Sequence, residues 1–546
     1  MLFILLSAVL IFPVLYGWGL LAERLLPEIS SHFLSGTLLT GICFVTCIAA
    51  ILAFFFPLNI YIEALVIAVG FTGLFLNRDK INFQNFDRKN LKIVFAGTLV
   101  TAFLSSFYPY ILDHFGYYVS TVNWLDEFGF VKGISNLDLT LGQTSFWHIL
   151  ESVFSHILDP FLRLNAIFTI LFLVYSIEKK SWLLLIFIPF FLLFVQSPSP
   201  DLAVMIISLI VVNEIFLKST NITFLFALSV FAFAIKPTIF WLPVFTFVYV
   251  LIILKSSFKN LIPGTFILIL MLIKNLYVFG YPIFPIAFFD LNLLWKPHPK
   301  LMEISSKFAV EKTFDNQFST AEINKFTVLE NIKNWLFIPG IKSVINILFI
   351  FALILFSIFT FIKKNKVISH LWISVIMKSI IILIISAQYR FFLDVFLIIF
   401  LTVFYSTISK SLALKISAVS SFLILIFFCF PKMISSAIPS YRMSEFMGKF
   451  EIKQLIKPSK YSYKAYQTFK VGNLTFHVSK NYPFNFDTPL PAISEGYLFD
   501  YQRTEIFPQM IDPNDISRGF VSKKMTSAEI RQLDEVIIIL KSTARP

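Results

Sequence analysis

Residues 93–118 read IVFAGTLVTAFLSSFYPYILDHFGYY, and this stretch decides the class of fold. Its first twenty residues carry no charge, which is the length and composition of a helix that crosses a bilayer. Asp113 and His114 follow at once. The sequence therefore predicts a span at 93–112 that ends directly on a carboxylate.

The composition of the whole chain agrees with this interpretation. Of its 546 residues, 57% are hydrophobic, 14% are charged and 68 are phenylalanine, and the mean hydropathy is +0.80. Because a soluble protein is roughly a quarter charged, the composition excludes the disordered, collagen-like, disulfide-scaffold and ordinary cytosolic classes. The predicted fold class is an α-helical polytopic membrane protein that also has a soluble part. Its predicted partners include the lipid bilayer.

Two further totals exclude other kinds of partner. The formal net charge is +13, but Lys and Arg are expected in the cytoplasmic loops of a membrane protein, so we predict no nucleic-acid partner. The three cysteines, Cys43, Cys47 and Cys429, lie in apolar runs. They give neither a disulfide framework nor a metal site.

Apolar runs between charged breaks predict about fourteen spans. The first run has no basic leader and no small-residue cleavage site, so we interpret it as a helix and not as a signal peptide. The predicted spans lie at 2–22, 33–56, 60–76, 93–112, 161–177, 181–196, 202–217, 221–235, 238–254, 261–277, 340–362, 367–387, 391–409 and 412–430.

The basic residues of the short loops predict that the N-terminus lies outside, because Lys and Arg concentrate in cytoplasmic loops. With this orientation the inner loops receive sixteen cations: Arg24, Arg78, Lys80, Arg88, Lys89, Lys92, Lys179, Lys180, Lys218, Lys255, Lys259, Lys363, Lys364, Lys366, Lys410 and Lys415. The short outer connections receive four, namely Lys132, Arg163, Lys236 and Arg390. The long loops 113–160 and 278–339 and the tail from 431 then share the outer side.

These features divide the chain into three parts. Residues 1–92 hold three leading spans and a basic loop, 93–430 form the transmembrane core with the two long outer loops, and 431–546 form a small α+β domain. In the tail, 474–479 and 535–540 are predicted as strands and 526–534 as a helix that starts at Thr526. Residues 278–300 contain two proline clusters and predict a non-helical lid, followed by one or two short polar helices at 301–335.

The first outer loop has apolar residues at helical spacing in two places. The two stripes predict a pair of short amphipathic helices lying on the outer leaflet. The stripes are Tyr118, Val122, Leu125 and Phe128, and then Trp147, Leu150, Phe154 and Ile157.

A long outer loop with two interfacial helices, opened by an acidic residue at the end of a span, resembles the GT-C superfamily. These are multi-span glycosyltransferases that use polyprenyl-phosphate-linked sugar donors. The chain is also similar to a group of uncharacterised bacterial membrane proteins of this layout. The short motifs that carry the resemblance, over about residues 90–410, are Asp113-x-x-Gly116-x-Tyr118, Trp124, Gly133, Asn136-Leu137, Trp147, Ser197-Pro198-Ser199-Pro200-Asp201, Lys274-Asn275, Gly280-Tyr281-Pro282 and Tyr389-Arg390-Phe391. The three leading spans are an addition to the superfamily's usual layout.

The resemblance implies a catalytic carboxylate and a phosphate-binding arginine. It implies that Asp113 activates the acceptor and that Arg390 holds the lipid-linked phosphate of the donor. Independently, partial desolvation at the membrane surface makes a carboxylate a better proton acceptor, and a guanidinium suits bidentate phosphate binding. The plain alternatives are a carboxylate that keeps the end of a span in water and an arginine that reaches from its span toward the headgroups.

Other charged residues at outer positions are weaker candidates. Lys236 and Lys274 fall at outer span ends and are candidates for binding the donor phosphate. Possible acceptor-binding or second carboxylate groups are His114, Asp126, Glu127 and Asp201. A solvated helix face is the better explanation of Asp126 and Glu127, and a helix N-terminus fully explains the position of Asp201. We assign no metal and no cofactor, since nothing in the sequence supports a divalent ion.

Two ionisable residues fall inside predicted spans. Lys378 and Asp394 lie in the spans at 367–387 and 391–409. Because such groups are costly in a bilayer unless they are paired, we expect them to form a structural pair across neighbouring helices.

The expected function is transfer of a sugar from a polyprenyl-phosphate-linked donor to an extracytoplasmic acceptor at a bacterial inner membrane. The chain has no Gly-rich nucleotide loop, which is consistent with a lipid-linked donor. One alternative is an envelope polysaccharide polymerase or ligase, which would favour arginine-rich outer loops. A second is a transporter or flippase, which would show repeated halves and broken helices.

Overall fold

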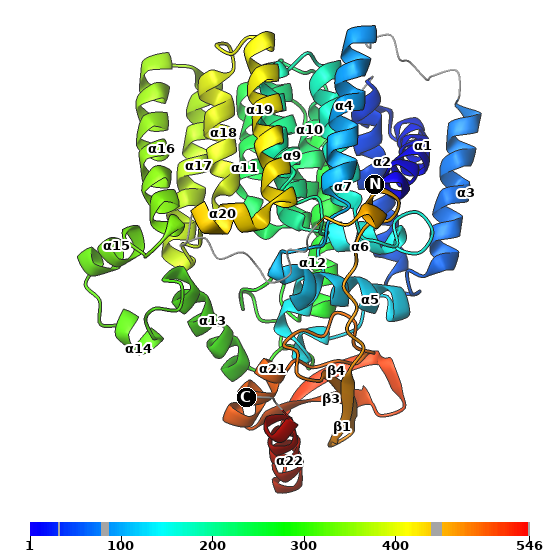
Figure 1. Ribbon diagram of the computed structural model, residues 1–546, viewed down its shortest axis with the longest axis vertical. Coiled ribbons are helices and arrows are strands. Elements are labelled where there is room, and N and C mark those ends of the chain that lie inside the picture. Colours follow the sequence, from blue (N-terminus) through cyan, green and yellow to red (C-terminus); the bar gives the residue numbers. More distant parts are fainter. Residues whose placement is uncertain (31–32, 78–86, 438–449, 544–546) are drawn as a thin grey trace.

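The computed structural model describes residues 1–30, 33–77, 87–437 and 450–543. A bundle of helices forms most of the molecule, and a small unit from the C-terminal part of the chain lies below one end of the bundle (Figure 1). Arg78 and Lys80, which contributed to the charge count, lie outside the described residues.

A helical segment lies at each of the fourteen predicted spans. These segments are α1 (Leu2–Leu25), α2 (Leu34–Leu52), α3 (Ile60–Leu76), α4 (Arg88–Leu104), α7 (Leu164–Glu178), the 3-10 helix Trp182–Phe187 with α8 (Ile188–Phe191), α9 (Pro200–Phe216), α10 (Ile222–Ile235), α11 (Trp241–Val248) with a π-helical turn Tyr249–Ile253, α12 (Ile262–Val278), α16 (Ile341–Lys363), α17 (Lys366–Ile385), α18 (Leu393–Phe404) and α19 (Lys410–Cys429).

The described residues contain six helices that are long and apolar enough to cross a membrane: Leu2–Leu25, Leu34–Leu52, Phe258–Val278, Ile341–Lys363, Lys366–Ile385 and Lys410–Cys429. They suggest a membrane protein. Several other segments are shorter than the prediction; α18 has 12 residues, which rise only about 18 Å against the ~30 Å of a hydrocarbon core. The side chains of α9 are almost all buried, so its apolar sequence serves packing against other helices.

The loops gather at two opposite ends of the bundle. At one end, the Glu178 carboxylate accepts from the Leu34 amide at 2.7 Å, and the Asn221 side chain donates to the Ile29 carbonyl at 3.1 Å. We call this the basic end, because the short loops that meet here carry most of the loop lysines counted above, among them Lys179, Lys180 and Lys218. The loop 113–160 and the C-terminal unit lie at the other end, which we call the site end (Figure 1).

The leading helices α1, α2 and α3 pack very closely. A Cβ built on Gly17 of α1 would lie 1.8 Å from the carbonyl oxygen of Gly70 on α3. A Cβ on Gly41 of α2 would lie 1.9 Å from the Leu15 carbonyl oxygen. Only glycine permits such backbone approach, as in other helix pairs joined through small residues.

The loop 113–160 folds into short helices that the protein itself covers. It contains a π-helical turn His114–Tyr118, α5 (Val119–Phe128), the 3-10 turns Ile134–Asn136 and Leu139–Gln143, and α6 (Phe146–Val153). Every residue of α6 is buried. The prediction of two helices lying on the outer leaflet is therefore wrong for α6, because its apolar stripe packs against other helices and not against lipid.

The loop 278–339 begins without helix and ends in three short helices. Its proline-containing part carries no helix up to His298, and α13 (Pro299–Thr313), α14 (Thr320–Ile323) and α15 (Val328–Leu336) follow. The loop contacts the connection between α17 and α18, because the Trp335 indole donates to the Ala387 carbonyl at 2.8 Å and the Ser386 hydroxyl to the Ala309 carbonyl at 3.1 Å.

The C-terminal unit contains two separate antiparallel hairpins and two helices. After α20 (Pro431–Ala437), its elements are the 3-10 turn Ile452–Leu455, β1 (Tyr466–Val471), β2 (Leu474–Ser479), α21 (Glu495–Thr504), β3 (Ile506–Asp512), β4 (Asp515–Lys524) and α22 (Ser527–Thr543). The predicted strand at 474–479 and the helix start at Thr526 are confirmed. The predicted strand at 535–540 is wrong, because these residues continue α22.

The C-terminal unit docks on the loop 113–160. The Asn136 side-chain amide donates to the carbonyl of Trp295 at 2.8 Å and of Phe520 at 3.3 Å. The Tyr501 hydroxyl donates to the carbonyls of Asn136 and Leu137 at 2.7 and 2.9 Å. Both long loops and the tail thus share the site end, as the charge count predicts.

Candidate functional site

The structure brings Asp113 and Arg390 together. Arg390 Nη1 donates to Asp113 Oδ2 at 2.9 Å, although 277 residues separate them in the sequence. Both side chains are about one-third exposed, Arg390 at 36% and Asp113 at 31%, so solvent reaches the pair. This ion pair forms the centre of the candidate site.

The sequence predicts that Asp113 lies directly at the end of a span, but the structure places it elsewhere. Helix α4 ends at Leu104, where the Ser105 and Ser106 hydroxyls donate to carbonyls of the last turn. Residues 108–111 then carry no helix, and Pro109 among them has no N–H group and restricts the residue before it. Asp113 starts the π-helical turn without capping it through its side chain, so its carboxylate is available for Arg390.

Arg390 lies in a 3-10 turn, Tyr389–Phe391, between α17 and α18. Its Nε atom is buried and has no hydrogen-bond partner in the described residues. Burial lowers the pKa of the guanidinium, but the Asp113 carboxylate and its other neighbours outweigh burial, so the net pKa is raised. Arg390 is therefore a permanent cation with an unused donor.

A second ion pair joins the first through an aromatic ring. Lys236, at the end of α10, pairs with Asp201 in the first turn of α9. The Phe391 ring centroid lies 5.4 Å from Lys236 Nζ and 5.0 Å from the guanidinium carbon of Arg390. Both distances suit a cation–π contact. Two cations and two carboxylates from four separate parts of the chain therefore form one cluster.

Two tyrosines of the π-helical turn border this cluster. The rings of Tyr117 and Tyr118 are 4.7 Å apart, and the His148 ring lies 5.0 Å from Tyr118. Burial raises the pKa of both phenols well above the ordinary value, and the Asp113 and Asp201 charges raise it further. The phenols stay protonated at neutral pH, and their hydroxyl groups remain able to donate.

Lys312 is a third cation, close enough to the Asp113–Arg390 pair to interact with its charges. It lies in the last turn of α13, next to Thr313, whose hydroxyl is 3.3 Å from that of Ser386. Partial desolvation and then the charge of Arg390 lower the pKa of the Lys312 ammonium, against the opposite effect of Asp113. The helix α13 thus brings positive charge to the Asp113–Arg390 pair from the loop 278–339.

The structure gives two of the predicted site residues other surroundings. Lys274 donates to the carbonyls of Gln143 and Thr144 at 2.8 and 3.0 Å, which ties α12 to the first long loop. The His114 ring packs on Phe115, 4.9 Å between centroids. Burial lowers the pKa of His114 well below its ordinary value, and the charges of Arg163 and Lys460 lower it further. These geometries favour a structural role for both residues.

The predicted carboxylates of α5 belong to a separate cluster. Asp126 Oδ1 lies 2.9 Å from His156 Nε2. On the other side of that histidine, the buried Glu63 carboxylate accepts from the amides of residues 156–158. Glu127 is exposed and lies beside Asp126. The cluster fixes the start of α3 to the loop 113–160 and does not include Asp113 or Arg390.

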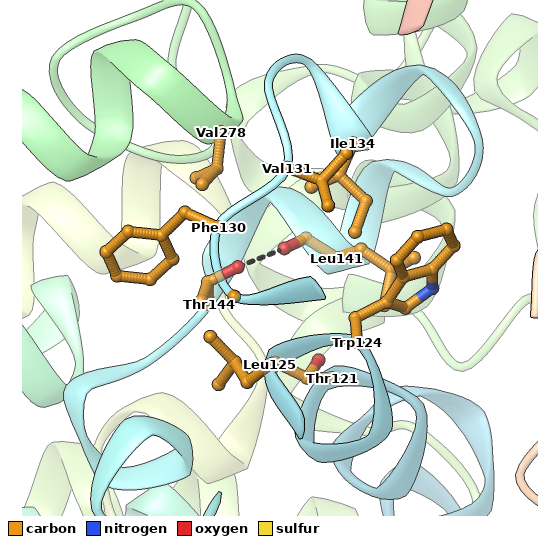
Figure 2. A pocket seen from close by; sticks show the side chains of 10 residues that line it. Thr121, Trp124, Leu125, Phe130, Val131, Ile134, Leu141, Thr144 and Val278 are labelled. Carbon is orange, nitrogen blue, oxygen red and sulfur yellow. Dashed lines mark hydrogen bonds between the residues drawn. The ribbon is translucent and has the colours of Figure 1, made fainter. Parts of the chain in front are cut away.

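A small pocket lies along α5. Figure 2 shows its lining residues, among them Trp124 and Leu125 of α5, Val131 and Ile134 of the following loop, and Val278 at the end of α12. The Thr144 hydroxyl donates to the Leu141 carbonyl beside it, at 2.6 Å, so its polar lining is already satisfied. The pocket is almost entirely apolar and holds no group suited to acid–base chemistry.

In the part of the chain that the structure describes, no group of three or more His, Cys, Asp or Glu side chains could hold a metal ion. The site itself offers carboxylates, cations and phenols. Together they can bind an anionic group and accept a proton from a hydroxyl.

Sequence reasoning missed Lys312 and Tyr117. Lys312 lies in a polar helix with two other lysines, Lys300 and Lys307, and nothing in the sequence distinguishes it from them. Tyr117 stands within the run Asp113-x-x-Gly116-x-Tyr118, and its place in the same helical turn as Asp113 was a usable signal.

The sequence model of a family described as "Domain of unknown function (DUF8201)" matches residues 1–397 of the chain. The match includes both members of the Asp113–Arg390 pair. It also includes helices α1–α3, which are additional to the usual layout of the GT-C superfamily. No curated protein and no solved structure matches the chain.

Proposed function

The chain belongs to this DUF8201 family, and we propose that it is a membrane glycosyltransferase. It moves a sugar from a polyprenyl-phosphate-linked donor to an extracytoplasmic glycan, lipid or protein acceptor. The observation that carries the proposal is the contact between Asp113 and Arg390, with the Lys236–Asp201 pair on the other side of Phe391.

The proposed reaction uses three groups of this cluster, namely Arg390, Lys236 and Asp113. Arg390 and Lys236 bind the phosphate of the donor and stabilise the negative charge that grows on it as the bond from the sugar's anomeric carbon to the phosphate oxygen breaks. Asp113 accepts the proton of the acceptor hydroxyl while that oxygen bonds to the anomeric carbon. Polyprenyl phosphate leaves with both electrons of the broken bond.

The position of the cluster suits a lipid-linked substrate. Arg390 connects α17, one of the six long apolar helices, to α18, and Asp113 follows α4. A phosphate bound here has its polyprenyl tail beside apolar helices, while the sugar extends toward the loops and the C-terminal unit. The lysines of the basic end favour a site that faces away from the cytoplasm, in a bacterial inner membrane.

A transfer assay with purified full-length protein tests the proposal. We expect the wild type to transfer sugar from at least one member of a set of polyprenyl-phosphate sugars. Asp113→Asn and Arg390→Ala should each lower kcat/KM by about 100-fold or more, the range of one lost acid–base or charge-stabilising group.

The matched control is Asp290→Asn, which removes the carboxylate of the exposed Lys296–Asp290 pair in the loop 278–339. It should transfer like the wild type. Wild-type protein that transfers none of the sugars contradicts the proposed function. Equal transfer by wild type and both site variants contradicts the assignment of the site.

A further inference from the structure

Both strong cations of the site already have a carboxylate partner. Arg390 Nη1 is held by Asp113 at 2.9 Å, and Lys236 is held by Asp201. An incoming phosphate must therefore compete with a carboxylate of the protein itself. This competition has a consequence for the order in which substrates bind.

The two pairs differ in how easily a ligand reaches them. The side chains of Lys236 and Asp201 are 12% and 18% exposed, against 36% and 31% for Arg390 and Asp113. An ion pair that is one-third exposed is weak, because water and salt screen it. The Asp113–Arg390 pair is therefore the one that an anion opens first.

Arg390 also has a free donor with which to accept a new anion. Its buried Nε has no hydrogen-bond partner in the described residues, whereas Nη1 points at Asp113. A phosphate group offers two or more acceptor oxygens in the geometry that suits a guanidinium edge. As the contact to Asp113 Oδ2 breaks, the guanidinium can turn toward the phosphate and offer it both Nη1 and the unpartnered Nε.

We propose that the Asp113–Arg390 pair is an exchange switch that makes the donor bind before the acceptor is activated. This inference rests on the proposed function. The donor phosphate replaces Asp113 on Arg390, and the released carboxylate becomes free to accept the proton of an acceptor hydroxyl. No covalent bond changes in this step: Arg390 loses one carboxylate contact and gains phosphate contacts.

The exchange predicts an unusual effect of removing the catalytic carboxylate. In the wild type, only the fraction of protein with an open pair is competent to bind the phosphate, which lowers the apparent affinity by that fraction. Asp113→Asn removes the competitor. It should bind polyprenyl phosphate about two- to fivefold more tightly than the wild type while losing transfer, a factor that corresponds to an ion pair of this exposure.

Equilibrium binding of polyprenyl phosphate, without sugar, to the full-length protein in lipid nanodiscs tests the exchange. Asp113→Asn alone also reduces general repulsion of an anion, so the same change is made in an Arg390→Gln background. The exchange predicts tighter binding only where Arg390 is present. The control Asp290→Asn, which leaves the site untouched, should bind polyprenyl phosphate like the wild type. Polyprenol, which lacks the phosphate, should show no saturable binding to any of the variants.

Two results overturn the exchange: Asp113→Asn that binds no more tightly than the wild type, or an equal gain with and without Arg390. Wild-type protein without saturable binding of polyprenyl phosphate overturns both the exchange and the donor class of the proposed function. Saturable binding without the Arg390-dependent gain overturns the exchange and leaves the donor class standing.

Discussion

The buried pair between Lys378 and Asp394 gives a sharp prediction about stability. Lys378 Nζ contacts Asp394 Oδ1 and Oδ2 at 2.5 and 2.6 Å, and the Trp241 indole donates to Oδ2 at 2.8 Å. The Lys378 side chain is 0% exposed. Replacing Asp394 by Leu leaves a buried ammonium without its counter-ion and an indole N–H without its acceptor.

Breaking a buried pair on one side costs about 3–5 kcal/mol, because the remaining charge keeps its desolvation penalty and loses its partner. We expect Asp394→Leu to lower the free energy of unfolding by this amount, which multiplies the unfolded fraction by about 100 or more. Lys378→Met should cost a similar amount. The double variant removes both charges and should lie within about 1–2 kcal/mol of the wild type.

Equilibrium unfolding in mixed micelles with increasing SDS measures the three free energies. The control is Asp290→Asn, which breaks an exposed pair and should cost at most about 1 kcal/mol. The reasoning is refuted if the single variants lie within about 1 kcal/mol of the wild type. A double variant that costs as much as the two single changes added together refutes it equally.

Three further predictions concern other parts of the fold. Gly17→Ala should lower the free energy of unfolding by about 1–3 kcal/mol, since its Cβ would meet the Gly70 carbonyl. The control Gly116→Ala, with no atom within 4 Å of the new Cβ, should unfold like the wild type in the same SDS titration. Burial lowers the pKa of His148 to about 3, so the folded state excludes a proton that the unfolded chain binds below pH 6.5. The free energy of unfolding should therefore fall by up to about 1.4 kcal/mol per pH unit as the pH drops from 6.5 toward 3. His148→Gln should flatten this part of a profile of thermal stability against pH. Tyr501→Phe removes the donor to the Asn136 and Leu137 carbonyls. This loss should lower the free energy of unfolding by about 1 kcal/mol and speed hydrogen exchange at residues 133–139. Unchanged exchange there would show that this hydroxyl does not hold the C-terminal unit.

The sequence predicts the grouping of the site because isolated charges in an apolar chain are informative. Asp113 and Arg390 stand next to apolar segments where composition gives no reason for a charge, and the charge count puts both at the same end. The same reasoning pairs Lys378 with Asp394, and the structure confirms this contact. These residues could be predicted because a charge beside or within an apolar helix needs a partner or water.

Other features depend on tertiary contacts that the sequence does not show. Lys274 resembles Lys236 in sequence position, but only the fold reveals that two backbone carbonyls surround its ammonium. Residues 536–540 read VIIIL, which favours a strand, yet the capping box of Thr526 and Glu529 starts a helix that continues through them. Apolarity likewise does not show which helices lie inside the bundle, as α9 does with almost all of its side chains buried.

The glycine contacts of α1 limit how the protein can move. A shift of α1 by one residue would replace Gly17 by Tyr16 or Trp18, where not even a methyl group fits against Gly70. Shear between packed helices, one of the common ways in which proteins change conformation, is therefore blocked among α1, α2 and α3. We expect these three helices to move together, so that a rearrangement of the site involves the other helices and the loop 278–339 that contacts the Arg390 turn.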